Sequence, residues 1–586
     1  MASGLGKESF RRISLAVLIG LVAGLGAMAF FVGLEWLRWF CLGYLAGAPA
    51  PAPDGERLVH LAVHTPYRAW VLFLVPVVGG LLSGILVYTF APEAEGHGTD
   101  AMIDSFHNLK GIIRTRVPFV KSAASIITLA TGGSAGREGP IAQIGAGFGS
   151  WVARTLKLPV RERRLFVLAG CAAGLGAIFR APLGAAITSV EVLYREDFES
   201  EAIIPCVIAS VIAFSLFTFV FGFDPIFGTP RFVFRDAREL LVYGVLGLLC
   251  APVGWAYVKF FYGVRDWFRT FTIPKHFRPM IGGMGVGLIA LFVPQAIGGG
   301  YGYLQQAIYG ELAIRVMLMA AAFKIVTTSL TIGSGGSGGV FGPTLFIGGM
   351  LGGVVGQVGH MLFPTVVTQP GAYVLVGMGA FFAGAAKAPL GALLMVSEMT
   401  WSYGLLPPLM LVAVIAITFN KGASIYEKQL DNKFQSPAHQ ADVTVNVLSD
   451  LKVSDIFKAE LPFASLKNDD NFRTLQRVIS QSSQSVFPVL DQTGFLTGIL
   501  ALTNVRTVLF EDSLRDLVVM GELATPPVSL SPDQDLYGAM LKFLETGYSQ
   551  LPVVGYPGGK QTVLGLLNHE DVIAAYHSEV SRRMAA

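Results

Sequence analysis

Long apolar runs separated by short polar turns fill the chain up to about Ala438. Four of these runs carry no charged residue over a membrane-spanning length, which is about 20 residues for a helix. They cover residues 13–34, 202–223, 240–258 and 280–305. The first run follows basic residues, as in a signal peptide, but it exceeds the apolar core of a signal peptide, which is about 7–15 residues. We therefore expect a membrane helix at each run and a polytopic α-helical protein.

Other apolar runs are shorter than a membrane crossing, such as residues 122–131 and 141–152. These two runs flank a glycine-rich segment. Helices that break inside a membrane protein are tolerated where their ends line a cavity. The pattern predicts half-helices around a polar pathway rather than a simple helix bundle.

The composition supports a membrane protein. Of the 586 residues, 53% are hydrophobic and 14% are charged, whereas roughly a quarter are charged in soluble domains. The net charge of +3 is too small to indicate nucleic acid as a partner. The four cysteines (Cys41, Cys171, Cys206 and Cys250) lie in apolar segments without the spacing of metal ligands or of a disulfide framework, and we interpret them as core residues.

Basic residues indicate the orientation of the chain. They cluster at residues 7–12, 110–121 and 154–164, and the positive-inside rule places such clusters on the cytoplasmic side. The charged C-terminal region shows no export signal, so we expect it in the cytoplasm too. The prediction is an integral protein of the plasma (inner) membrane with its N-terminus cytoplasmic.

Two glycine-rich segments repeat each other at an offset of 203 residues. Residues 132–140 read GGSAGREGP and residues 335–343 read GGSGGVFGP. Further repeats occur at an offset of 207, namely APLGA at residues 181–185 and 388–392, and Glu191 with Glu398. Matching glycine breaks in two halves of a membrane protein are typical of inverted-repeat transporters. We expect an ion transporter with repeat halves at about residues 13–230 and 235–430 of a transmembrane domain that covers residues 1–437.

The Gly…Pro layout of both segments suits an anion site. An anion that enters a membrane protein must have its lost hydration replaced. The first turn of a helix offers unsatisfied backbone N–H groups and a partial positive charge of roughly half a unit. Such a site binds an anion weakly enough to let it leave, as conduction requires. The alternative interpretation is small-residue helix packing, but two copies at matched places favour the anion site.

The motifs at residues 136–140 (GREGP) and 339–343 (GVFGP), with a late tyrosine at Tyr426, resemble the CLC family of chloride channels and proton-coupled chloride exchangers. The resemblance covers the whole membrane part. It implies a homodimer with one pore in each subunit, embedded in lipid and without a cofactor. It also implies that Val340 and Phe341 give backbone N–H groups to the anion and that Tyr426 gives its hydroxyl. The candidate anion-binding positions are His97, Gly98, Arg137, Gly139, Val340, Phe341 and Tyr426.

Glu138 is the candidate gate. A carboxylate in an apolar, glycine-rich membrane segment is costly, and ionisable groups in such places are generally functional. A tethered carboxylate can occupy an anion site and block it until protonation or a permeant ion displaces it. The resemblance implies the same role. The alternative, an ion pair with Arg137, is weaker because adjacent residues on a helix do not face each other.

One departure from the family pattern lies at the first anion-binding motif. Where the family has Gly-Ser-Gly-Ile-Pro, residues 96–100 read GHGTD, so His97 replaces a hydroxyl and Asp100 replaces proline. An imidazole that binds the anion would make binding depend on pH. In the alternative, His97 points away and only backbone contacts remain. Selectivity for chloride over other anions is therefore open.

A second departure concerns proton coupling. Family exchangers usually carry Glu-Glu at the end of the Ala-Pro-Leu helix, and the second glutamate is an internal proton-transfer site. This chain reads Val190-Glu191-Val192, which leaves valine at that site. Because valine carries no proton, we predict a channel, with the coupled exchanger as the alternative. Glu191 is either a relay one position away or a structural residue at a helix end.

The tail after Ala438 contains its own duplication. An apolar strand, a turn and a second apolar strand recur at about residues 485–503 and 549–568, each after an amphipathic helix at residues 472–480 or 536–545. This resembles a tandem pair of CBS domains, predicted at residues 451–510 and 511–580 after a linker at residues 438–450. The predicted fold is thus an all-α membrane protein with an inverted repeat of broken helices, followed by an α/β CBS pair.

CBS pairs often bind adenine nucleotides through a Ser/Thr-x-x-Asp motif after the second strand. The first copy has Thr503 but Arg506 in place of the acid, and the second has Asp571 but Asn568 in place of the hydroxyl. Adenine nucleotide is therefore a candidate ligand, and a structural, dimerising role is the alternative.

A third functional class is an intramembrane enzyme or nucleotide sensor whose glycine-rich loops bind phosphate. The sequence opposes this class, because no loop carries Gly-Lys-Ser/Thr and no His-Glu-x-x-His or metal-binding acidic cluster occurs. We predict that the protein is not an enzyme and that it holds no metal.

Overall fold

The computed structural model describes residues 2–56, 65–420, 422–439, 447–459, 462–505 and 518–585. They form two compact units, Met1–Lys433 and Phe434–Ala586. Parts of the predicted linker and of both predicted CBS domains, including Arg506, lie outside the described residues.

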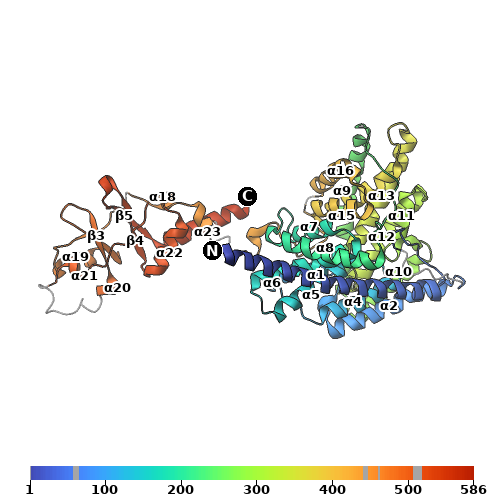
Figure 1. The fold of residues 1–586 in the computed structure, drawn as a ribbon, viewed down its shortest axis with the longest axis horizontal. Coiled ribbons are helices and arrows are strands. Elements are labelled where there is room, and N and C mark those ends of the chain that lie inside the picture. The colour runs from blue at the N-terminus through green and yellow to red at the C-terminus, as the bar shows by residue number, and fades with distance from the viewer. Residues whose placement is uncertain are drawn as a thin grey trace. The chain divides into compact units, whose positions relative to one another are not determined.

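The larger unit is built from α-helices (Figure 1). Its first half contains α1 (Ala2–Arg38, continued by the π-helix Trp39–Leu45), α2 (Ala69–Phe90), α3 (Thr99–His107), α4 (Val117–Ala130), α5 (Glu138–Thr155), α6 (Val160–Phe179), α7 (Pro182–Glu191) and α8 (Ile203–Phe221). Its second half contains α9 (Glu239–Arg269), α10 (Arg278–Ala290), α11 (Tyr301–Ile308), α12 (Ile314–Gly333), α13 (Phe341–Leu362), α14 (Pro370–Ala386), α15 (Pro389–Thr400) and α16 (Leu406–Phe419).

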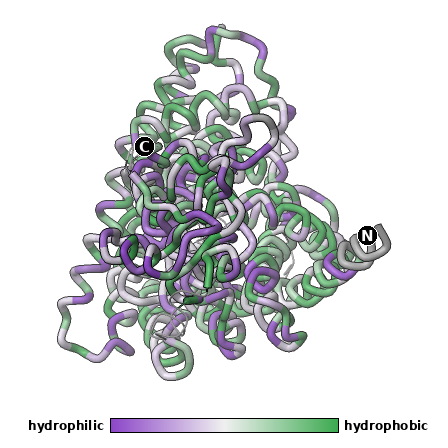
Figure 2. Tube along the Cα trace, turned by 90° about the vertical axis from the view of Figure 1, so that its left-hand side faces the viewer, coloured by the Kyte–Doolittle hydropathy of each residue, from purple (hydrophilic) through white to green (hydrophobic). Residues whose placement is uncertain are grey.

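Six helical segments of the described chain are long and apolar enough to cross a membrane. They are Phe10–Leu45, Ala69–Phe90, Ser200–Phe221, Glu239–Arg269, Ile314–Gly333 and Phe341–Leu362. Hydrophobic residues follow the helices of this unit over most of their length (Figure 2). Three of the four predicted spans, at residues 13–34, 202–223 and 240–258, fall on such segments and are confirmed.

The predicted span at residues 280–305 is wrong. The chain leaves α10 at Ala290 and begins α11 only at Tyr301. Pro294 cannot continue a helix, and Gly298 and Gly300 have φ values of +59° and +80°, which glycine adopts at little cost. The hydropathy of this segment therefore did not reveal the turn that separates the two short helices α10 and α11.

The half-helix predicted before the first glycine-rich segment is confirmed by α4, and α5, after that segment, is longer than the predicted run but is not among the six membrane-spanning segments. Helix α4 has 14 residues, which is too short for a crossing. Helix α5 has 18 residues because it extends to Glu138 at one end and to Arg154 and Thr155 at the other. At 1.5 Å per residue this gives a helix of about 27 Å.

Two buried hydrogen bonds reveal the symmetry between the halves. The hydroxyl oxygens of Ser125 and Ser337 lie 2.9 Å apart, and those of Ser134 and Thr328 lie 3.0 Å apart. The offset of 203 makes Ser125 equivalent to Thr328 and Ser134 equivalent to Ser337. Exchanging the two repeats therefore exchanges the two hydrogen bonds, as a two-fold relation requires. The predicted repeat of broken helices is confirmed.

Buried polar residues refine the sequence interpretation. All four cysteines are buried, as predicted. Lys121, which the sequence groups with a surface-facing basic cluster, lies fully buried on α4 and donates to the carbonyl oxygens of Ala94 and Gly96 at 3.0 and 2.7 Å. Lys121 therefore donates its hydrogen bonds to two turn carbonyls inside the protein.

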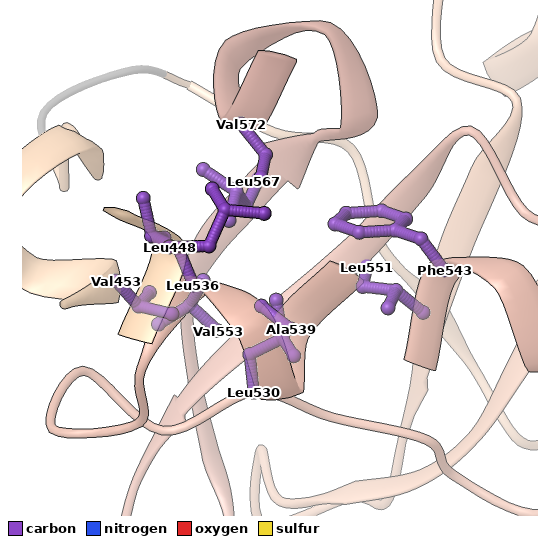
Figure 3. Close-up of a cluster of buried hydrophobic side chains, with 10 residues drawn as sticks. All are labelled: Leu448, Val453, Leu530, Leu536, Ala539, Phe543, Leu551, Val553, Leu567 and Val572. Carbon is purple, nitrogen blue, oxygen red and sulfur yellow. The ribbon is translucent and has the colours of Figure 1, made fainter. Parts of the chain in front are cut away.

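The smaller unit has the predicted α/β character. Its first copy contains β1 (Leu466–Lys467), α19 (Phe472–Gln481), β2 (Val486–Leu490) and β3 (Leu496–Ala501). The second contains α22 (Leu536–Thr546), β4 (Gln550–Gly555), β5 (Thr562–Asn568) and α23 (His569–Ala585). The strand pairs β2–β3 and β4–β5 are antiparallel. Apolar side chains from α22, β4, β5 and α23 meet in one core (Figure 3), which explains why each strand pair needs its flanking helices.

Candidate functional site

The two glycine-rich segments are buried in the larger unit and pair with each other. Gly136 N–H donates to the carbonyl of Gly339 at 2.7 Å, and Gly339 N–H donates to the carbonyl of Gly136 at 2.6 Å. Helices α5 and α13 begin within two residues of this bridge. A third segment joins them, because Gly96 N–H donates to the carbonyl of Gly336 and the Gly96 carbonyl accepts from Gly338 N–H, both at 3.2 Å. The N-termini of α3, α5 and α13 therefore gather at one place.

Glycine is required where these segments touch. A Cβ atom on Gly139 would lie 1.8 Å from the carbonyl oxygen of His97. Gly98 has a φ of +81°, and a Cβ there would lie 2.7 Å from the carbonyl oxygen of Gly139. The predicted anion-binding positions Gly98 and Gly139 thus face each other through their backbones.

The Glu138 carboxylate occupies the N-terminus of α13. This side chain is buried, with 2% of the residue exposed. Its Oε2 atom accepts a hydrogen bond from Gly342 N–H at 3.1 Å, in the first turn of α13. Its Oε1 atom accepts a hydrogen bond from the hydroxyl of Tyr301. A negatively charged group thus lies where unpaired helix amides can bind an anion.

Arg137 does not pair with Glu138. Its guanidinium forms a bidentate ion pair with Glu56, with an Nη1–Oε2 distance of 2.9 Å, and both residues are buried. A buried charge of this kind requires such a partner. Any contact of Arg137 with an anion therefore involves its backbone rather than its side chain. The sequence offered no signal for Glu56.

Val340 and Phe341 begin α13, as the anion-site prediction requires. Both are buried, at 1% and 4% exposure. The Phe341 ring packs against Phe382, with centroids 4.2 Å apart, and against Phe179, at 5.5 Å. This packing fixes the start of the helix, whose first amides have no partner within the helix.

Asp100 orders the segment that carries Tyr426. Its carboxylate accepts hydrogen bonds from the backbone N–H groups of Glu427 at 3.3 Å and Lys428 at 3.1 Å. The same carboxylate lies 3.1 Å from Nε2 of His97. The His97 and Tyr426 rings are in contact, with centroids 5.6 Å apart. Asp100, which stands where the family has proline, therefore helps to hold the segment around Tyr426 next to His97.

The His97 ring has one nitrogen left for a ligand. Nε2 faces the Asp100 carboxylate and therefore carries a proton. Nδ1 is buried and has no hydrogen-bond partner among the residues that the structure describes. In the neutral ring Nδ1 is an acceptor, so it offers an anion a donor only when the ring is protonated.

The position of the missing proton acid is buried and apolar. Val192 is 2% exposed. Its neighbour Glu191 binds the start of α15, accepting from Leu390 N–H at 3.0 Å and from Gly391 N–H at 2.7 Å. Of the two interpretations of Glu191, this geometry supports the structural one.

Tyr301 and the buried lysines were missed by the sequence analysis. Tyr301 follows a glycine turn equivalent to the one before Thr99. Lys324 is equivalent to Lys121 at the offset of 203 and donates to the carbonyl of Gly298 at 2.6 Å. The repeat could have revealed the two lysines, because it aligns them within apolar helices.

The two candidate nucleotide-binding residues of the tail, Thr503 and Asp571, lie far apart in the sequence. Each forms a hydrogen bond with a different neighbouring residue. The Asp571 carboxylate accepts from the side-chain amide of Asn568 at 2.8 Å. The Thr503 hydroxyl donates to the side chain of Asn504 at 3.5 Å. The binding role of both residues stays a prediction.

Comparisons with known proteins show the family of this chain. Residues 79–421 match the family described as voltage gated chloride channel, and residues 519–578 match the CBS domain. The chain is 32% identical over 406 residues to a putative chloride channel protein, ClcB-like, of Ralstonia nicotianae, covering 69% of this chain and 92% of the relative. It is 30% identical over 451 residues to the H(+)/Cl(-) exchange transporter ClcA of Salmonella typhimurium, covering 74% and 92%.

A solved structure shares the fold. It is that of a slow cyanobacterial Cl-/H+ antiporter, with a TM-score of 0.63 and 24% identity, covering 71% of this chain and 96% of that chain. At this identity the likeness concerns the fold alone.

Proposed function

The chain belongs to the voltage gated chloride channel family of anion-transporting membrane proteins, and from this premise we propose that it is a proton-coupled chloride exchanger gated by Glu138. The protein is an integral, multi-pass membrane protein. The observation that carries the gating proposal is the bond between Gly342 N–H and Glu138 at the start of α13. The tethered carboxylate occupies an anion position, so an anion can pass only after it leaves.

Protonation would release this gate. A neutral carboxyl accepts a weaker hydrogen bond than a carboxylate does, and it no longer gains from the positive end of the helix. The same proton can then be carried to the other side when Glu138 returns. In this way one residue would couple anion and proton movement.

We now favour exchange over a channel, although the sequence analysis gave exchange only as the alternative. Relatives at 30–31% identity are named H(+)/Cl(-) exchange transporters. The channel remains the second candidate because Val192 places no titratable group at the internal proton site. In an exchanger with Val192, protons would reach Glu138 by water or by another acid.

The anion site itself combines helix ends with His97. We propose that the backbone N–H groups of Val340 and Phe341 bind the anion together with the Tyr426 hydroxyl. Protonated His97 would add a donor through Nδ1, because Nε2 is engaged by Asp100. Anion affinity would therefore increase on acidification.

The remaining partners are proposals from the family. We expect a homodimer in a plasma-type membrane with the N-terminus and the CBS pair in the cytoplasm. An adenine nucleotide is the candidate ligand of the CBS pair.

Flux measurements in liposomes test the proposal. A chloride gradient across the membrane should drive protons in the opposite direction in the parent protein, and Glu138→Gln should stop this proton movement while chloride still flows. Chloride flux without proton movement in the parent would favour the channel, and absence of chloride flux would contradict anion transport.

A further inference from the structure

We propose that Tyr301 is a latch that holds the Glu138 gate closed and sets the acidity at which it opens. This inference rests on the proposed gating role of Glu138. Tyr301 is a positioning residue that acts through Glu138.

Two donors from the second repeat hold the Glu138 carboxylate. The hydroxyl of Tyr301, at the start of α11, donates to Oε1, and Gly342 N–H, at the start of α13, donates to Oε2. Both oxygens are thereby engaged, so the carboxylate has one fixed orientation. Tyr301 is thus one of the partners from the second repeat that would have to be released for the gate to move.

The space for the latch depends on Gly342. A Cβ atom on Gly342 would lie 2.9 Å from the Tyr301 hydroxyl oxygen and 3.0 Å from Glu138 Oε1. Both separations are too short for ordinary contact, so an alanine there would press on both partners of the hydrogen bond. The missing side chain at Gly342 therefore leaves the space that the Tyr301 hydroxyl occupies.

The ring of Tyr301 is fixed by its neighbours. The guanidinium carbon of Arg137 lies 4.9 Å from the ring centroid, and the Phe227 ring lies 5.9 Å away. Arg137 is fixed in turn by its ion pair with Glu56. A fixed ring loses little conformational entropy when its hydroxyl binds Glu138.

Tyr301 also borders an open space. It lines a cavity of about 310 Å³ together with Gly298, Gly299, Gly300 and Tyr303, whereas Glu138 does not line this cavity. Tyr301 therefore lies between the cavity and the gate.

The latch favours the charged, closed gate. A hydroxyl donor stabilises a carboxylate more than a neutral carboxyl. Loss of the donor therefore makes Glu138 easier to protonate, and protonation occurs at higher pH. The other titratable groups whose charges act on Glu138, or on which it acts, are Arg137, Glu56, Lys324 and Tyr426. All four remain in the test variants.

The experiment is the pH profile of chloride efflux from liposomes. Tyr301→Phe keeps the ring and removes only the hydroxyl, and we expect the acid-activated part of the profile to move to higher pH by about one unit. The matched control is Tyr303→Phe, which removes a hydroxyl from the same cavity wall and should leave the profile unchanged. Gly342→Ala, which displaces the hydroxyl without altering it, should shift the profile in the same direction.

A double substitution shows whether Tyr301→Phe acts through Glu138 or through a nonspecific change in the structure. In a Glu138→Gln background, Tyr301→Phe should cause no further change. Coincident profiles of the parent, Tyr301→Phe and Gly342→Ala, with Glu138→Gln still abolishing the pH response, would overturn the latch and leave the gate. A pH response that survives in Glu138→Gln would overturn the gate and the latch together.

Discussion

Glu191 and Glu398 each bind the first turn of the helix on which the other lies. Glu191 ends α7 and accepts from the amides of Leu390 and Gly391 in α15. Glu398, near the end of α15, accepts from the amides of Leu183 at 3.2 Å and Gly184 at 2.7 Å in α7. The two helices therefore lie side by side and antiparallel. Each carboxylate satisfies amides that would otherwise lack a partner.

This exchange predicts a structural role for both glutamates. Glu191→Gln and Glu398→Gln each replace one carboxylate oxygen by an amide donor, which cannot bind a backbone N–H. We expect each substitution to cost about 1–3 kcal/mol of stability and to lower the thermal unfolding midpoint in detergent. Proton coupling in the folded fraction should be unchanged in both.

The pair is its own control, because Glu398 has no place in any proton path suggested by the sequence. Glu191→Gln could instead abolish proton movement at normal stability while Glu398→Gln did not. Glu191 would then be a proton relay, and its hydrogen bonds to the start of α15 would not be its main role.

Glu138→Gln should open the anion path. Glutamine has the size of glutamate but no charge, so it gains less from the positive end of α13. Chloride efflux from liposomes should rise at neutral pH and lose most of its pH dependence. An unchanged pH response in Glu138→Gln would remove the gating assignment.

Much of the site was predictable because it is duplicated. The repeat identified the segments around Gly136 and Gly339, which the structure joins by two hydrogen bonds. Glu138 was recognised because a charge stands out in an apolar segment. Glu56 and Tyr301 could not be found in this way, since each acts through a partner distant in sequence. The turn at Gly298 was hidden because glycine and proline do not lower hydropathy enough to mark a break.

His97 should make anion binding depend on pH. With Nε2 engaged by Asp100, only the protonated ring offers a donor at Nδ1. We expect chloride affinity, measured by titration calorimetry, to rise several-fold on acidification in the parent and to vary less in His97→Ser. To exclude the gate as the cause, both proteins should carry Glu138→Gln. Equal pH dependence in the two would show that the backbone and Tyr426 bind the anion without His97.

Asn568 should limit nucleotide binding by the tail. Its amide donates to the Asp571 carboxylate, and the Ser/Thr-x-x-Asp motif of nucleotide-binding CBS pairs is completed by Asn568→Thr. We expect ATP to stabilise Asn568→Thr more strongly than the parent in thermal unfolding. The control is Asn568→Thr with Asp571→Ala, which should lose the gain. A parent that ATP stabilises as strongly as the variant would mean that the incomplete motif suffices.

The reversal potential should distinguish exchange from conduction. In a coupled exchanger, the potential at zero current depends on both gradients, so it should differ from the chloride equilibrium potential and move when the pH gradient is changed at constant chloride. In Glu138→Gln it should return to the chloride equilibrium potential, because the proton carrier is lost. The parent is informative because Val192 is buried and cannot titrate. A parent that already follows the chloride gradient alone would establish that Val192 decides the mechanism, and the protein would be a channel. A displaced parent potential would instead show that protons reach Glu138 without an acid at position 192.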